Sequence, residues 1–229
     1  QIVTPGVNFD LSHAGKGKSH GWFFFTCYNS EQANTLLEVN ASQNDKDFIM
    51  AVNWKKAEEY IKAGKGKIEK TKYAHNTWND ETHTGTSVIK DEVLVLDAMA
   101  MKDICYLMPC PKSPHGCDVD PTGEYIVGSG KLAALIPVFS FDKMVKAIGK
   151  KDYEGDYEGI PVLKYNSVLH GEVQKPGLGP LHTEFDGRGN AYTTFFVSSE
   201  VVKWDIKTLK VLDRVPTYYS VGHLCIPGG

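Results

Sequence analysis

One pattern occurs twice in the chain and restricts its fold more than any other feature. A histidine is followed by a Gly/Asp turn and then by an aromatic, β-branched stretch, first in 114–127 and again in 179–197. In both copies a tyrosine lies ten residues after the histidine, Tyr125 after His115 and Tyr192 after His182. Repeated strand-and-turn units are typical of β-propellers and related architectures. Two histidines in equivalent positions predict a site assembled from repeats.

Short strands separated by turns are predicted along most of the chain, and 22 glycines and 11 prolines agree with a turn-rich β protein. We expect strands at 21–28, 47–54, 93–96, 104–108, 133–141, 200–206 and 210–213, and short helices at 55–63 and 142–148. Pro137 predicts an edge or a bulge in its strand. The segments 64–85 and 153–166 are polar or charged and lack sustained periodicity, so they are predicted to be loops or insertions.

A β-sandwich and a β-propeller are both compatible with these strands. The segment 201–211 resembles the third strand, turn and fourth strand of a propeller blade, which favours the propeller. In that architecture the innermost strand of each blade borders a central channel, so His115 and His182 are expected to face a common point. His223 lies where another blade would begin. Spacing alone leaves open whether these histidines bind a metal or only bond to neighbouring backbone.

Composition and motifs exclude several classes of function. A formal net charge of −3 gives no overall attraction to nucleic acid, and no apolar run approaches the ~20 residues needed to span a bilayer. The five cysteines form no Cys-x-x-Cys pair and are expected to be mostly buried. Imidazoles without a carboxylate at fixed spacing suit copper, zinc or iron better than magnesium or calcium. The polar segment from Tyr28 to Asp45 is either a site for a hard cation or an ordinary turn.

Five segments, in order along nearly the whole chain, resemble nitrous oxide reductases. They are 26–31, 113–116, 179–194, 201–204 and 222–223, and the match over 179–204 is the most specific. The resemblance implies a periplasmic seven-bladed propeller whose hub holds a tetranuclear copper-sulfide centre bound by seven histidines. It also implies nitrous oxide as the substrate, a cytochrome or cupredoxin as electron donor, and a homodimer.

Residue by residue, the resemblance assigns His115, His182 and His223 as copper ligands. It also assigns a calcium site to Tyr28, Glu31, the carbonyl of Val39, Asp45 and Ser113, although Ser113 stands where the family has asparagine. Residues 1–229 are expected to form about four blades of one propeller domain, without the cupredoxin-like domain that holds the dinuclear copper site. Three histidines cannot hold four copper ions, so this segment alone is expected to be inactive, and its open strand edges to make it associate or unfold.

Two alternatives remain at this stage. The first is a non-catalytic propeller that acts as a binding or interaction scaffold, in which the three histidines only make structural hydrogen bonds. The second is a metal-dependent hydrolase on the same fold, which requires carboxylates beside the histidines.

Overall fold

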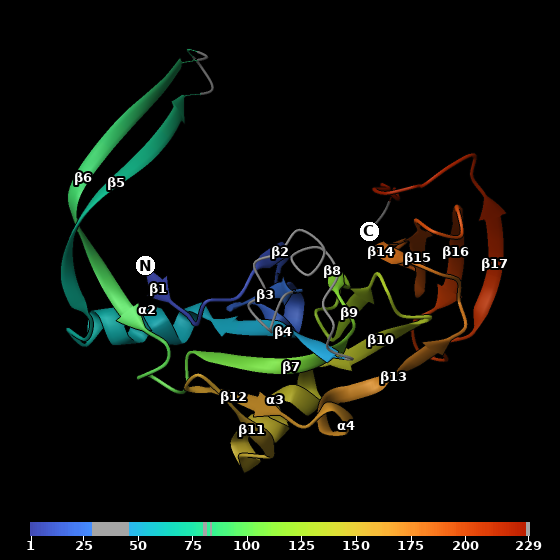
Figure 1. Ribbon diagram of the computed structural model, residues 1–229, viewed down its shortest axis with the longest axis horizontal. Coiled ribbons are helices and arrows are strands. Elements are labelled where there is room, and N and C mark those ends of the chain that lie inside the picture. The colour runs from blue at the N-terminus through green and yellow to red at the C-terminus, as the bar shows by residue number, and fades with distance from the viewer. Residues whose placement is uncertain (29–45, 80–81, 83, 228–229) are drawn as a thin grey trace.

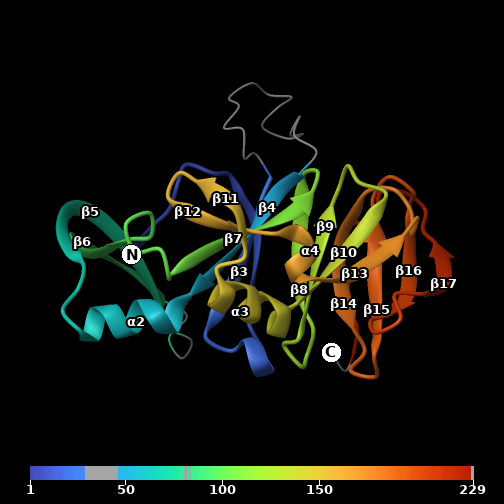
Figure 2. The same ribbon diagram turned by 90° about the horizontal axis from the view of Figure 1, so that it is seen from below.

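The computed structural model describes residues 1–28, 46–79, 82 and 84–227, and strands dominate it. The strands form four sheets, and three of these contain four consecutive antiparallel strands in the order of a propeller blade. Figure 2 shows these three sheets side by side, from β3 through β9 to β17. The prediction of an all-β chain forming part of a β-propeller is confirmed.

The first blade-like unit is built on the apolar run predicted at 21–28. Its strands are β2 (Phe9–Ala14), β3 (Trp22–Cys27), β4 (Lys46–Asn53) and β7 (Cys105–Pro111). The next strands along this sheet are β12 (Ile160–Leu163) and β11 (Tyr153–Tyr157). Helix α2 (Trp54–Lys62) follows β4 directly, and the Asn53 side chain caps it by accepting a bond from the Lys56 amide at 3.0 Å.

The two copies of the sequence repeat form the second and third units. The second contains β8 (Pro114–Val119), β9 (Tyr125–Gly130), β10 (Leu135–Ser140) and β13 (Leu169–Gln174). Helices α3 (Phe141–Lys150) and α4 (Tyr165–Val168) lie in the connection from β10 to β13. The third contains β14 (Pro180–Phe185), β15 (Asn190–Phe195), β16 (Glu200–Asp205) and β17 (Val211–Pro216). In both copies the histidine therefore lies on the first strand, at one edge of its sheet.

Two segments predicted to be loops are strands instead. Within 64–85 the chain forms β5 (Lys67–Asn79), which pairs with β6 (Thr84–Asp97) in a long hairpin, and β6 also pairs with the short β1 (Ile2–Val3). This hairpin projects from the body of the molecule (Figure 1), and the polar sequence 64–85 gives no alternating hydrophobic signal. The strand predicted at 93–96 forms the end of β6, where Val95 and Leu96 are buried. Within 153–166 the strands β11 and β12 form a second hairpin, at the edge of the first sheet.

Pro137 lies in an internal strand, since β10 is bonded to both β13 and β9. Its register shifts at Val138/Phe139, so the predicted bulge is present in this strand and the predicted edge is not. Within the ladder, pairing with β9 begins only at Val138, so Pro137 lies outside that pairing.

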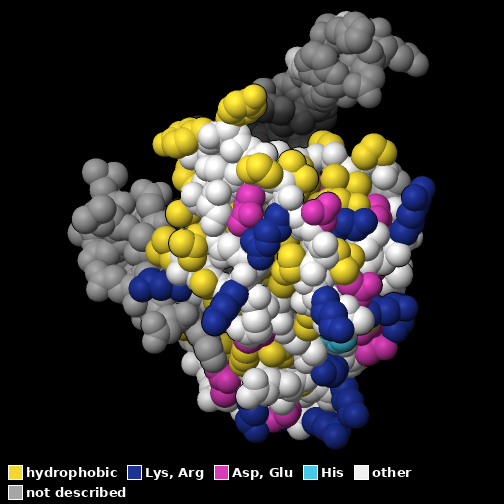
Figure 3. Space-filling view, turned by 90° about the vertical axis from the view of Figure 1, so that its right-hand side faces the viewer, with side chains coloured by type: hydrophobic (Ala, Val, Ile, Leu, Met, Phe, Trp, Pro, Cys, Tyr) yellow, Lys and Arg dark blue, Asp and Glu magenta, His cyan; other side chains and the backbone are white. Residues whose placement is uncertain are grey.

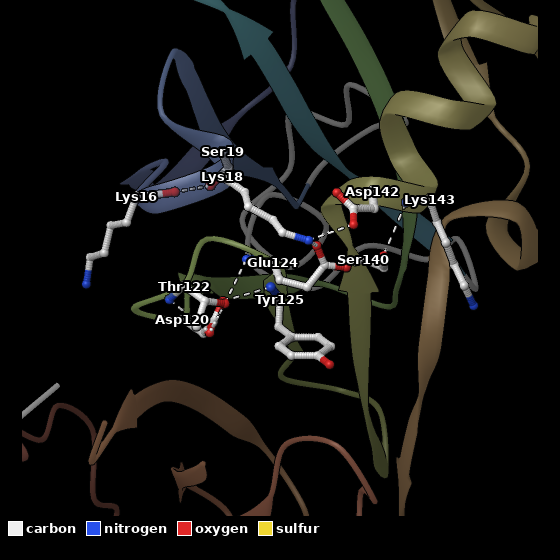
Figure 4. A network of polar contacts seen from close by, with 10 residues as sticks. All are labelled: Lys16, Lys18, Ser19, Asp120, Thr122, Glu124, Tyr125, Ser140, Asp142 and Lys143. Carbon is white, nitrogen blue, oxygen red and sulfur yellow. Dashed lines mark hydrogen bonds and ion pairs between the residues drawn. The ribbon is translucent and has the colours of Figure 1, made fainter. Parts of the chain in front are cut away.

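Neighbouring units are joined by apolar packing and by polar contacts. Phe24 and Ile49 of the first sheet share a core with Val119 and Phe139 of the second. Figure 4 shows the polar contacts: the ammonium of Lys18, in the 3-10 turn η1 (Gly17–Ser19), lies 3.1 Å from Glu124 Oε2 and 2.7 Å from Asp142 Oδ2. Ser140 donates to Glu124 Oε1 at 2.6 Å and caps α3. The Lys18 contacts thus tie the connection between β2 and β3 to the second unit.

The side of the third sheet that faces the viewer in Figure 3 carries hydrophobic side chains among charged ones. Exposed large hydrophobic residues in this sheet and its loops are Leu178, Phe196, Val197, Leu212 and Val215. Leu212 and Val215 lie on the edge strand β17, and Leu178, Phe196 and Val197 lie outside the strands, so these side chains do not form one face of the sheet. In the described part of the chain, no helix is long and apolar enough to cross a membrane.

Candidate metal centre

Three histidines from separate segments lie ring to ring. His115 is the second residue of β8, His182 the third residue of β14, and His223 lies in the non-strand segment after β17. The ring centroids of His115 and His182 are 4.9 Å apart, and those of His182 and His223 are 4.1 Å apart. The structure therefore brings together the three residues that the repeat and the resemblance singled out.

Each of the three innermost strands carries a β-bulge at this point. In β2 the residues Asp10 and Leu11 lie opposite the single Thr26, and in β14 Leu181 and His182 lie opposite the single Thr194. In β8 the extra residue is His115 itself, because Pro114 pairs with Gly130 and Gly116 with Ser129. A bulge changes the direction of a side chain relative to the regular alternation of a strand. Here it occurs in every strand that contributes to the site.

Close approach of β8 and β14 also depends on Gly116. A Cβ atom at this position would lie 2.1 Å from the Leu181 carbonyl oxygen, so only glycine allows the two backbones to come this near. The Thr183 amide crosses the same gap and donates to Asp118 Oδ2 at 2.7 Å.

Asp10 is the residue that sequence reasoning missed. Its Oδ2 lies 2.7 Å from His115 Nδ1, and the Lys131 ammonium is 3.7 Å from the same oxygen. A carboxylate only accepts hydrogen bonds, so a neutral His115 carries its proton on Nδ1 and leaves the Nε2 lone pair available. Burial alone would raise the pKa of Asp10, but the hydrogen bond and charge of His115, with Lys131, lower it overall. The sequence carries no local signal for this contact, because Asp10 and His115 are 105 residues apart.

His182 is held as a neutral imidazole. Burial is the main cause of its lowered pKa, with contributions from His115 and His223, and Asp118 acts in the opposite direction. Its Nε2 atom is buried and has no hydrogen-bond partner within the described residues. An unpaired buried polar atom is costly, and a neutral ring nitrogen is a good ligand for copper, zinc or iron.

The His115 ring meets the His182 ring edge-on at an interplanar angle of 79°, and the His182 ring is tilted by 31° to that of His223. Across the described residues, no group of three or more His, Cys, Asp or Glu side chains is arranged to hold a metal ion. The donor set nevertheless suits a soft or borderline metal, because His182 Nε2 is unpaired and His115 Nε2 is left free by Asp10. The role of the histidines as ligands stays a prediction.

His13 lies on β2, beside the second sheet. Its Nδ1 accepts a bond from the Val119 amide at 3.1 Å and lies 3.8 Å from Asp118 Oδ1. Glu184, on β14, has a raised pKa because of burial, and Asp118 adds to this effect. The inner strands thus carry a second group of titratable side chains, which consists of His13, Asp118 and Glu184.

The predicted calcium ligands are only partly described. Glu31, Val39 and Asp45 lie outside the described residues. The Tyr28 ring has the Lys131 ammonium 4.9 Å from its centroid, and the buried Ser113 donates its amide to Asp47 Oδ2 at 2.9 Å. Calcium binding therefore stays a prediction.

Comparison with known proteins gives consistent sequence matches. The chain is 32% identical to the nitrous-oxide reductase of Stutzerimonas stutzeri over 98% of its residues, and 33% identical to that of Pseudomonas fluorescens over 97%. It covers 32% of the length of each of these relatives. The enzyme of the same name from Ralstonia nicotianae is 38% identical over 50% of the chain and 18% of its own length. These matches confirm the resemblance found from the sequence.

No family model matches the chain. Among solved structures, apo AztD from Citrobacter koseri superposes with a TM-score of 0.46 at 10% identity, over 95% of this chain and 38% of that one. A nidogen/laminin complex superposes with a TM-score of 0.40 at 8% identity, over 93% and 49% of the respective chains.

Proposed function

We propose that this chain is part of a nitrous-oxide reductase, and that it supplies His115, His182 and His223 as ligands of the catalytic copper centre. The meeting of the three imidazoles carries the proposal, because they come from segments far apart in the sequence and include a buried ring nitrogen without a partner. The similarity to nitrous-oxide reductases over nearly the whole chain supports the choice of metal and reaction.

The chain spans about a third of the length of the relatives it matches, so the remaining ligands and the dinuclear copper domain are proposed to lie in other parts of a longer protein. When bound, the tetranuclear copper-sulfide centre would supply the electrons that, with two protons, convert nitrous oxide to dinitrogen and water. The proposed setting is the periplasm, with a cytochrome or cupredoxin as electron donor and a homodimer as the working form.

The residues of this chain hold and orient the centre. Asp10 fixes the Nδ1–H tautomer of His115 and aligns its ring. Burial keeps His182 neutral, which preserves its lone pair for a metal. The close contact at Gly116 keeps the two inner strands near enough for both rings to reach one centre.

His182→Ala tests the proposal in the full-length protein, with His170→Ala as the matched control. His170 packs on Tyr125 and lies 3.1 Å from the Lys207 carbonyl oxygen, outside the histidine cluster. We expect His182→Ala to lose copper and change the anaerobic absorption spectrum, and His170→Ala to keep both. If His182→Ala retained the copper content and spectrum of the wild type, the histidines would be structural and the scaffold alternative would be favoured.

A further inference from the structure

Two buried threonine hydroxyls occupy the gaps that the bulges leave in the strand ladders. Thr26 Oγ1 accepts a bond from the Leu11 amide at 3.0 Å, and Thr194 Oγ1 accepts one from the His182 amide at 3.2 Å. Both threonines are fully buried. In each case the hydroxyl replaces a ladder partner that the extra residue has displaced, since a buried backbone N–H requires an acceptor.

The same two hydroxyls contact the backbone of the candidate ligands. Thr26 donates to the His115 carbonyl oxygen at 2.8 Å, which ties the first sheet to the bulge of the second. Thr194 Oγ1 lies 3.5 Å from the His182 carbonyl oxygen, so it contacts both polar backbone groups of that residue. The backbone of each bulged histidine is therefore held by a side chain and not by a regular ladder bond alone.

We propose that Thr26 and Thr194 are positioning residues of the copper site, which fix the bulged backbone of His115 and His182 and so set the directions in which the two side chains leave the backbone. This inference rests on the proposed function, because it assigns the threonines a role in placing metal ligands. The hydroxyl is the essential group: valine has nearly the same shape but cannot accept the amide bond, whereas serine keeps it.

Thr193 provides a control for general loss of stability. It is buried in the same strand, and its hydroxyl bonds to Thr183 Oγ1 at 2.7 Å and accepts from Trp204 Nε1 at 2.9 Å. Thr193→Val thus breaks a buried hydroxyl network next to Thr194 without removing the bond to His182.

The test compares Thr194→Val, Thr194→Ser, Thr26→Val and Thr193→Val in the full-length protein. The readouts are the copper retained after challenge with a chelator, the absorption spectrum, and the rate of hydrogen exchange over 180–185 in the metal-free protein. We expect Thr194→Val and Thr26→Val to weaken copper retention on the order of 10-fold and to alter the spectrum. Thr194→Val should also speed exchange of the His182 amide, and Thr194→Ser should restore both properties.

The inference would be overturned if Thr194→Val and Thr26→Val retained as much copper as Thr193→Val and had the same spectrum as the wild type. Thr26→Val reaches His115 from another sheet, so the test stands even where Thr194→Val does not fold. His182→Ala in the same series separates the two ideas. If it loses copper while the threonine variants do not, only the positioning role fails, and if it keeps copper, the proposed function fails.

Discussion

Replacing Gly116 with alanine tests whether the approach of β8 to β14 builds the site. The added Cβ would lie 2.1 Å from the Leu181 carbonyl oxygen and 3.0 Å from Asp118 Oδ2. To reach an acceptable contact the two strands must separate by roughly 1 Å. Overpacking of this kind typically lowers the free energy of unfolding by about 1–3 kcal/mol. The same displacement would move the ring of His115 away from that of His182, whose centroids are now 4.9 Å apart. We therefore expect Gly116→Ala to lower both stability and copper content.

The assay is urea unfolding of the full-length protein together with copper analysis, and Gly149→Ala is the control. A Cβ at Gly149, near the end of α3, meets no atom within 4 Å, and alanine favours a helix by about 1 kcal/mol over glycine. Gly149→Ala should keep its copper and be equally or slightly more stable. A Gly116→Ala protein that matched Gly149→Ala in unfolding midpoint and copper content would refute the reasoning.

Three other predictions concern single side chains. Asp10→Asn should weaken copper retention on the order of 10-fold, because it removes the charge that fixes the His115 tautomer, whereas Asp142→Asn, at an exposed ion pair, should not. Trp204→Phe should lower the free energy of unfolding by about 1–3 kcal/mol, because it removes a buried N–H donor and leaves space, and denaturant unfolding measures this. The pKa of Asp186 is lowered to about 2: burial alone would raise it, but hydrogen bonds from Asn190 and the Arg188 amide outweigh burial. The ionised carboxylate therefore stabilises the fold above its ordinary pKa of 3.8, and this contribution is lost as pH falls towards 2. The difference in free energy of unfolding between the wild type and Asp186→Asn should therefore shrink as the pH falls from 3.8 towards 2. Denaturant titrations measure this, and a difference that stayed constant over that range would contradict it.

The equivalent placement of His115 and His182 was predictable because the sequence around them repeats. The histidine and the following tyrosine recur at equal spacing with a Gly/Asp turn between them, and the structure places both histidines on the first strand of a four-stranded sheet. The segments 21–28 and 47–54 were also predictable, since buried strands such as β3 and β4 form continuous apolar runs.

Other features leave little local signal in the sequence. The β5–β6 hairpin projects from the body of the molecule, and the polar sequence of 64–85 has no hydrophobic alternation, so that sequence is typical of a loop. The bulges depend on pairing between strands, and the residue types at Leu11 and His182 do not predict them. Asp10 lies 105 residues from His115, so their hydrogen bond follows only from the packing of two sheets.

Cysteine burial has a practical consequence for measurement. Burial raises the pKa of Cys105 to about 12 and that of Cys110 and Cys117 well above the usual value, so these thiols stay protonated and poorly reactive. Cys27 is buried as well, whereas Cys225, two residues after His223, is exposed. Within this chain a maleimide fluorophore should therefore attach selectively beside the histidine cluster. Copper quenches nearby fluorophores, so such a label would report metal loading directly during maturation of the protein.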